Sequence, residues 1–159
     1  MRSVPHPVAA LAPTLSRRSF AFLTAGAVAL GTAGCARDEG PDELEAPWAA
    51  ARADAATAAA AAGASPDVAT RLTPVAEARR AHADALGAEI RRARPDRAEA
   101  LDAPPPATPP VADPVAALRT SLVAARDAAS TLAVTTARYR AGLVASVAAS
   151  CAGWAEALT

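Results

Sequence analysis

Apolar residues recur at steps of three and four through most of the chain after residue 44, which is the spacing of one face of an α-helix. The first such seam consists largely of alanine: Leu44, Trp48, Ala51, Ala55, Ala58 and Ala62. It ends at Gly63, and Ser65 followed by Pro66 and Asp67 is typical of a helix start, with a capping hydroxyl and a first-turn proline. The pattern predicts one helix up to residue 63 and a second from about residue 66.

The second helix can run to Arg94, where Pro95 stops it. Within it, Thr73-Pro74 offers another cap and start, so we expect a kink or a break there. The segment 96–113 contains five prolines in two runs, which predicts an extended, polyproline-like crossover. Such a connection is long enough to return along a bundle, so the second and third helices can lie parallel.

Asp113-Pro114 supplies another helix start. Two seams follow it, the second displaced by one residue: Val115, Leu118, Leu122, Ala125, Ala129, Leu132, Thr136 and Tyr139, then Val144, Val147, Cys151, Trp154 and Leu158. Either one helix of about 45 residues drifts in phase, or a turn within 135–142 separates two helices. We favour the turn because it builds a compact core. The expected fold is all-α, a four-helix bundle with a Pro-rich crossover between helices 2 and 3.

The N-terminal region carries a different pattern. Residues 1–18 contain three arginines and no acid, and an apolar run of about 11 residues follows from Phe20 to Leu30. A membrane-spanning helix needs about 20 apolar residues, so this run is too short to be one. The order of a basic stretch and a short apolar run predicts a secretory signal peptide.

Two motifs refine this prediction. Ser16-Arg17-Arg18-Ser19-Phe20 resembles the twin-arginine export signal, and Thr32-Ala33-Gly34-Cys35 resembles the lipobox of bacterial lipoproteins. In such lipoproteins the cysteine is diacylglycerylated and the chain is cut just before it. The alternative is an ordinary signal cut near Gly34 or Ala36, with Cys35 unmodified.

The predicted organisation is therefore a signal peptide over 1–34, a lipidated N-terminus and tether over 35–46, and a helical domain over 47–159. Two acyl chains hold a protein on a bilayer where one would dissociate. The expected location is the outer face of the cytoplasmic membrane, with the lipid anchor as the membrane contact and an envelope protein or a small ligand as the possible partner.

The composition limits the classes of partner that the chain is expected to bind. All 16 basic residues are arginine, and three of them fall in the predicted signal, so the mature chain would carry a net charge of about −3. An acidic chain is a poor candidate for nucleic-acid binding, which rewards a basic face. Lipidation of Cys35 would leave Cys151 without a partner, as a small buried apolar residue, whereas a disulfide between them would contradict the lipobox interpretation.

The candidate site lies on the second helix. Its seam runs through Val68, Leu72, Val75, Arg79, His82, Leu86 and Glu89, so that Arg79, His82 and Glu89 fall where apolar residues are expected. They could meet Asp127 or Glu156 and hold a metal ion or a polar ligand. Alternatively, they form a paired network in the core, or they reach water along their stems. We favour the structural alternatives and expect no metal and no cofactor, because His82 would be the only histidine after signal removal.

Catalysis has little support in the sequence. His82 could be combined on paper with Ser121, Ser130, Ser146 or Ser150, but no nucleophile-elbow motif or glycine loop accompanies them. Serine within a helix commonly packs or bonds to the preceding turn. We therefore expect no enzymatic activity.

Two stretches carry a family resemblance: 79–86, which reads RRAHADAL, and 139–152, which reads YRAGLVASVAASCA. Together with the signal they resemble actinobacterial alanine-rich exported proteins related to the ferritin-like superfamily. The resemblance implies a ferritin-like bundle. It does not imply di-iron chemistry, which needs Glu-x-x-His on two helices, because Arg79 stands three residues before His82 here.

Two functional hypotheses follow. The preferred one is a non-enzymatic envelope lipoprotein whose helical bundle binds a partner protein or a small ligand. The alternative is a degenerate ferritin-like protein that binds a metal or a cofactor through His82 with Glu77, Asp84 and Glu89.

Overall fold

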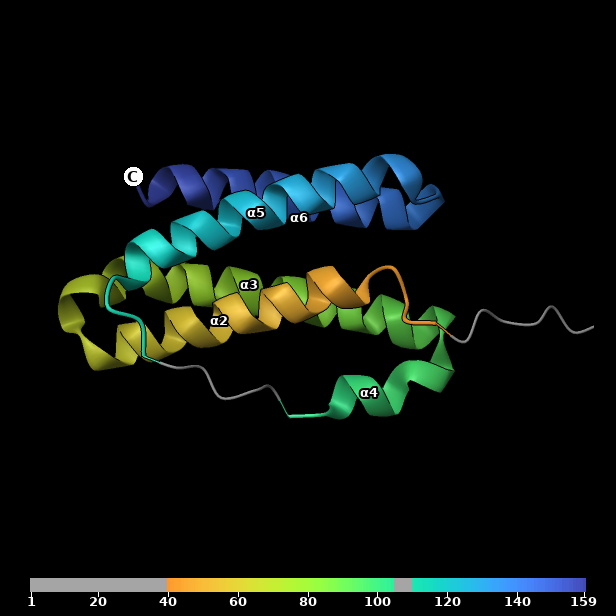
Figure 1. Cartoon of the computed structure of the whole chain (residues 1–159), viewed down its shortest axis with the longest axis horizontal. Coiled ribbons are helices and arrows are strands. Elements are labelled where there is room, and N and C mark those ends of the chain that lie inside the picture. The colour runs from red at the N-terminus through yellow and green to blue at the C-terminus, as the bar shows by residue number, and fades with distance from the viewer. Residues whose placement is uncertain (1–39, 105–109) are drawn as a thin grey trace, which may run out of the picture. The chain divides into compact units, whose positions relative to one another are not determined.

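The computed structural model of the chain describes residues 40–104 and 110–159 (Figure 1). The chain divides into two units, Met1–Gly40 and Pro41–Thr159, and the second is the folded domain treated below. The signal residues Ser16, Arg17, Arg18 and Phe20 and the lipobox residue Cys35 lie outside the described residues, so what was inferred from them stays a prediction. No helix in the described ranges is long and apolar enough to cross a membrane.

The described residues are helical and contain no strand, which confirms the all-α class. In the described part of the chain, four long helices are joined by short turns and one crossover: α2 (Glu45–Ala64), α3 (Pro66–Ala93), α5 (Pro114–Thr135) and α6 (Arg138–Ala157). The crossover begins with a 3₁₀ turn, η1 (Pro95–Arg97), and a short helix, α4 (Ala98–Asp102). The break between α5 and α6 confirms the predicted turn.

The long helices pack as two pairs, α2 with α3 and α5 with α6, and the pairs meet mainly through α2 and α5 (Figure 1). The start of α5 lies beside the α2–α3 connection, because Pro114 and Val68 line the same cavity. At the other end, Arg140 near the start of α6 bonds to Glu89 near the end of α3. Helices α3 and α5 therefore run in the same direction, as the long crossover predicted.

The core consists mainly of leucine, valine and alanine from all four long helices. The alanine seam of α2 is confirmed, since Ala51, Ala55 and Ala58 are buried. Asp42 and Leu44 are buried as well, so the folded unit begins at Pro41 and takes in residues that the sequence assigned to the tether. Leu44, the first residue of the apolar seam, already packs into the core.

Three local predictions are corrected. The crossover is not extended over 98–102, because Leu101 packs into the core and Arg97 pairs with Glu45 at 2.7 Å. Of the kink or break expected at Pro74, the break is absent: α3 runs through the proline, and Leu72 and Val75 on either side of it are fully buried. Tyr139, placed in the α5 seam by the sequence, is exposed because α5 ends at Thr135.

Of the helix caps predicted at Asp113 and Ser65, the first is confirmed and the second is not. The Asp113 side chain accepts a hydrogen bond from the Ala116 amide at 3.0 Å, which confirms the predicted cap of α5. Ser65 has the extended backbone of a cap, but its hydroxyl makes no capping bond. At that position the proline at the first helical turn, rather than the hydroxyl, marks the start of α3.

Candidate functional site

A polar cluster lies inside the domain where the two helix pairs meet, and each long helix contributes to it. The members are Asp54 from α2, Arg79 and His82 from α3, Ser121 from α5 and Cys151 from α6. Arg79, Asp54 and Cys151 are buried, and His82 and Ser121 are half-buried. The cluster links all four long helices within a core made mainly of leucine, valine and alanine.

Arg79 is the centre of this cluster and is fully buried. Its Nε donates to Asp54 Oδ2 at 2.9 Å, and its Nη1 donates to Cys151 Sγ at 3.1 Å and to His82 Nδ1 at 3.2 Å. Its Nη2 also lies 2.9 Å from Asp54 Oδ2, but it has no well-aligned acceptor in the described part of the chain. Because a guanidinium only donates, His82 Nδ1 must be the unprotonated nitrogen of its ring.

The sequence places Arg79 here by helical spacing. Residues 72, 75, 79, 86 and 90 of α3 face the core at steps of three, four, seven and four, so the arginine sits on the buried stripe. Burying an unpaired guanidinium would cost several kcal/mol. Asp54 on the neighbouring helix offsets that cost, and Ser121 donates to the other oxygen of the same carboxylate.

Burial shifts the pKa of both titratable neighbours of Arg79, His82 and Cys151. Desolvation, aided by the positive charge of Arg79, lowers the pKa of His82 to about 4. Burial raises the pKa of the Cys151 thiol, and the nearby Arg79 only partly opposes this. Both groups are therefore neutral near pH 7, which makes Cys151 a weak nucleophile.

Ser121, His82 and Asp54 do not form a Ser-His-Asp arrangement. Ser121 donates to Asp54, whereas His82 faces Arg79, so the imidazole is not placed to take a proton from this hydroxyl. Ser146 bonds back to the Leu143 carbonyl of its own helix. The charged groups of the cluster pair with one another, and its hydrogen bonds connect the four long helices.

Glu89 belongs to a second network at the other end of α3. Its carboxylate accepts from Arg92 at 2.7 Å and from Arg140 of α6 at 3.0 Å. Arg140 also binds Asp42 and Glu43, just before α2, at 3.0 and 3.2 Å. Hydrogen bonds from Arg92 and then Arg140 outweigh desolvation and lower the pKa of Glu89 to about 2. This network fixes the start of the domain to α3 and α6.

The structure brings only part of the predicted site together. Arg79 and His82 are in contact, but Glu89 is engaged elsewhere, Asp127 pairs with Arg126 at the surface and Glu156 is exposed. Glu77 and Asp84, also considered as ligands, are exposed on α3. Among the residues described there is no group of three or more histidine, cysteine or acidic side chains able to hold a metal ion.

Sequence reasoning missed Asp54, Cys151 as a polar contact, and Arg140. Asp54 had a signal, because it is the single acid between Glu45 and Asp67 in a helix made largely of alanine. Arg140 and Cys151 had none, since their partners lie 51 or more residues away in the chain. Such contacts depend on how the two helix pairs dock.

A polar groove, here named the Trp48 groove, lies between α2, α3 and α4 and has a volume of about 420 Å³. Its wall includes the Trp48 indole and the guanidinium groups of Arg52, Arg80 and Arg91. Arg52 lies over the indole, 4.7 Å from the ring centroid, and donates to the Ala103 carbonyl at 3.1 Å. The groove therefore combines an aromatic surface with an excess of positive charge.

Gly87 on α3 determines how closely Trp48 can approach this helix. A Cβ atom at Gly87 would lie 3.1 Å from Trp48 Nε1 and 3.4 Å from Cδ1. A side chain at position 87 would therefore require the indole to shift by a few tenths of an ångström. Arg91 is tied to Asp102 at 2.7 Å, whereas Arg80 forms no ion pair with any residue in 40–104 or 110–159.

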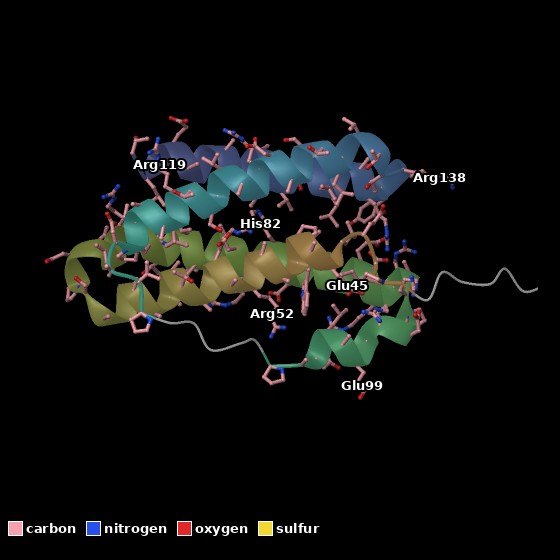
Figure 2. All side chains as sticks on the ribbon, in the orientation of Figure 1. Glu45, Arg52, His82, Glu99, Arg119 and Arg138 are labelled. Carbon is pink, nitrogen blue, oxygen red and sulfur yellow. The ribbon has the colours of Figure 1, made fainter. Side chains whose placement is uncertain are left out.

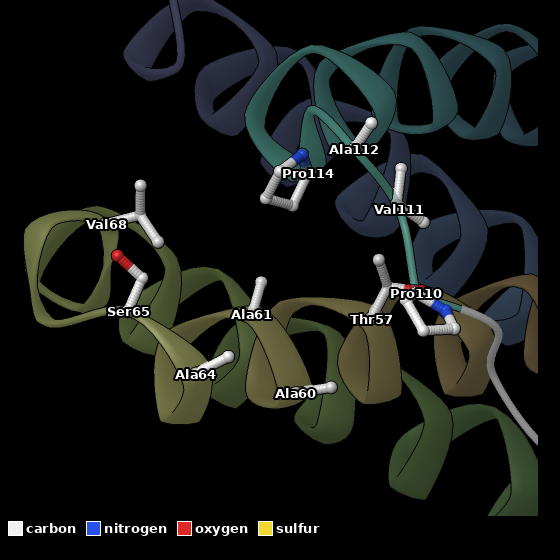
Figure 3. Close-up of a pocket in the computed structure, with 10 residues that line it drawn as sticks. All are labelled: Thr57, Ala60, Ala61, Ala64, Ser65, Val68, Pro110, Val111, Ala112 and Pro114. Carbon is white, nitrogen blue, oxygen red and sulfur yellow. The ribbon is translucent and has the colours of Figure 1, made fainter.

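A second cavity of about 530 Å³ lies between the α2–α3 connection and the segment leading into α5 (Figure 3). Its lining is mostly alanine, valine and proline, and Thr57 and Ser65 contribute hydroxyl groups. It carries no charged side chain. It offers less chemical selectivity than the Trp48 groove.

Comparisons with known proteins identify no relative: no family model matches the chain, and no curated protein or solved structure is significantly similar to it.

Proposed function

We propose that this chain is a non-enzymatic cell-envelope lipoprotein, exported by the twin-arginine route and anchored through Cys35, whose helical domain binds an anionic ligand in the Trp48 groove. The anchor is supported by the order of Arg17-Arg18, the short apolar run and the small residues before Cys35. The domain then stands beside the outer face of the cytoplasmic membrane.

The domain itself is proposed to be a four-helix bundle of the ferritin-like type. One long crossover between the second and third long helices is the connection that distinguishes this type from an up-and-down bundle. The parallel course of α3 and α5 supports it. The chemistry of that superfamily is not proposed, because Arg79 and not a glutamate precedes His82 by three residues.

The observation that carries the binding proposal is the charge of the Trp48 groove. Three guanidinium groups and one carboxylate, Asp84, line it beside an indole, and Arg80 has no ion-pair partner in the described residues. Guanidinium groups favour carboxylates and phosphates, and the indole favours an apolar or aromatic body. A small ligand with both parts fits this lining.

Titration with 8-anilino-1-naphthalenesulfonate, an anionic aromatic probe, tests the binding proposal. We expect its fluorescence to rise saturably with the native chain and the affinity to fall about 5- to 20-fold in Arg80→Ala, the equivalent of roughly 1–2 kcal/mol. Arg119→Ala is the matched control, because Arg119 is an exposed arginine on α5, far from Arg52 of the groove (Figure 2). Equal loss in both variants, or no loss in Arg80→Ala, would contradict the assignment of the groove.

A further inference from the structure

The start of the folded domain lies against the turn between α5 and α6. Asp42 is buried, and its carboxylate binds Arg140 through contacts of 3.0 and 3.2 Å. Asp42 also accepts from the Leu44 amide at 2.9 Å. The point at which the tether joins the domain is therefore fixed beside residues 135–140.

The tether is short compared with the helices. Asp42 follows Cys35 by seven positions in the chain, and a fully extended chain of that length spans at most about 25 Å. Helix α3, with 28 residues, is about 42 Å long. If Cys35 is held in a bilayer, the acyl chains cannot reach past the far ends of the helices, so the α5–α6 turn is the end kept near the lipid.

The same turn exposes apolar and basic side chains. Val134 is 84% exposed and Tyr139 is 69% exposed, and Val111 near the start of α5 is the other large exposed hydrophobic residue described. Arg138 lies between them in sequence and forms no ion pair within the described ranges; Figure 2 shows it at the extremity of the domain. Its φ of 57° is left-handed, a conformation that costs a non-glycine residue about 1 kcal/mol.

Four acids that the structure describes near this end are paired. Asp42, Glu43 and Glu89 are bound by Arg140, and Glu45 is bound by Arg97. These pairs remove the repulsion that free carboxylates would feel from phosphate groups. Arg138 remains available for a phosphate, and tyrosine favours the interface between water and hydrocarbon.

We propose that the α5–α6 turn is a membrane-contact surface, in which Val134 and Tyr139 enter the headgroup region of a phospholipid bilayer and Arg138 binds lipid phosphate. This inference rests on the proposed lipid anchor at Cys35. Two side chains would bind a membrane only weakly by themselves. Attached to an anchor, they meet the bilayer at a high effective concentration, so the contact sets the orientation of the domain.

Lipid quenching tests the proposal with the full lipidated chain in vesicles of phosphatidylcholine and phosphatidylglycerol. Tyr139→Trp and Val111→Trp each add one indole, the first at the turn and the second near the start of α5. Acyl-brominated phosphatidylcholine should quench the indole added at position 139 and leave the one at position 111 unquenched. No quenching at position 139, or equal quenching at both positions, would overturn the proposal.

A measurement on the native residues complements this experiment. Amide hydrogen exchange over 134–141 should slow when the lipidated chain is placed in vesicles, and the slowing should be lost in Val134→Ser/Tyr139→Ser. Co-sedimentation with vesicles is read in the same samples. A chain that does not co-sediment refutes the anchor and this inference with it, whereas one that co-sediments with unchanged exchange refutes this inference and leaves the anchor standing.

Discussion

Arg79 of α3 and Asp54 of α2 form an ion pair, with Nε 2.9 Å from Oδ2, in which the arginine side chain is 1% exposed and the aspartate side chain 6% exposed. In a core built largely of alanine and leucine, this pair and its contacts to Ser121 and Cys151 set how the two helix pairs meet. Such a buried pair adds little net stability, but removal of one partner is strongly destabilising because the other charge stays buried and unpaired.

Asp54→Ala should therefore be strongly destabilising. Removal of the carboxylate leaves the buried Arg79 charge uncompensated, and we expect the free energy of unfolding to fall by about 3–5 kcal/mol. Urea denaturation followed by circular dichroism measures this. Asp127→Ala is the matched control: it removes an exposed carboxylate paired with Arg126 and should cost no more than about 1 kcal/mol.

The double variant Asp54→Ala/Arg79→Met separates the pair from its parts. With both charges removed, an apolar chain of similar length fills the space of Arg79, and most of the stability lost in Asp54→Ala should return. A double variant as unstable as Asp54→Ala alone would show that Arg79 is not the reason Asp54 matters.

Glu89 should make the domain sensitive to acid. Its pKa in the folded state is about 2, below the ordinary value of 4.5, because Arg92 and Arg140 bond to the ionised form. The folded state then binds fewer protons than the unfolded state between these values. The stabilisation, about 1–3 kcal/mol, is present above pH 4.5 and is lost as the pH falls toward 2.

Unfolding free energies measured from pH 6 to pH 2 test this. Glu89→Gln should be less stable at pH 6 and should show a flatter decline between pH 4.5 and pH 2 than the native chain. Glu99→Gln, which changes an exposed residue of α4, should follow the native curve. Parallel curves for Glu89→Gln and the native chain would rule out the proposed role of Glu89.

His82 should remain neutral well below the usual range of histidine. Its pKa is lowered to about 4 by burial and by the charge of Arg79, so the unfolded state binds the extra proton first as the pH falls below about 6.5. The contribution of His82 to stability is therefore full above pH 6.5 and declines toward pH 4. NMR titration of the imidazole should give an apparent pKa near 4, and Arg79→Met should raise it. A value near 6.5 in the folded chain would mean that the ring is solvated.

Gly87 should resist a side chain, although α3 is helical there. Replacing glycine by alanine in a helix interior usually gains about 0.5–1 kcal/mol. At Gly153, where nothing lies within 4 Å of the added Cβ, Gly153→Ala should show this gain. Gly87→Ala should show none, because Trp48 must move, and its indole emission should shift. Equal stabilisation of both variants would mean that Trp48 does not pack against Gly87.

The helices were largely predictable from the sequence, because their signals are local. Pro66 and Pro114 mark two starts, Pro95 ends α3, and the phase shift after Tyr139 predicted the turn. The proline signals misled the prediction at α4 and at Pro74 for a common reason: burial against distant helices keeps α4 helical and α3 unbroken, and local proline signals do not report it.

The candidate site was only half predictable. Arg79 on an apolar stripe signalled a buried polar group, since the helical period alone decides which face is buried. Its partners come from α2, α5 and α6, and their choice depends on the docking of the two pairs. Glu89 shares the stripe of Arg79 but joins a different network, because Arg140 approaches only the far end of α3.

The lipid anchor is the central claim, and the mass of the mature chain tests it most directly. Protein extracted from membranes of a twin-arginine-competent, lipoprotein-processing host should begin at Cys35 and carry a diacylglyceryl group on that residue. Cys35→Ser should leave the membrane fraction, whereas Cys151→Ser should stay. A wild-type chain recovered from the medium, cut near Ala36 and without lipid, would contradict the account.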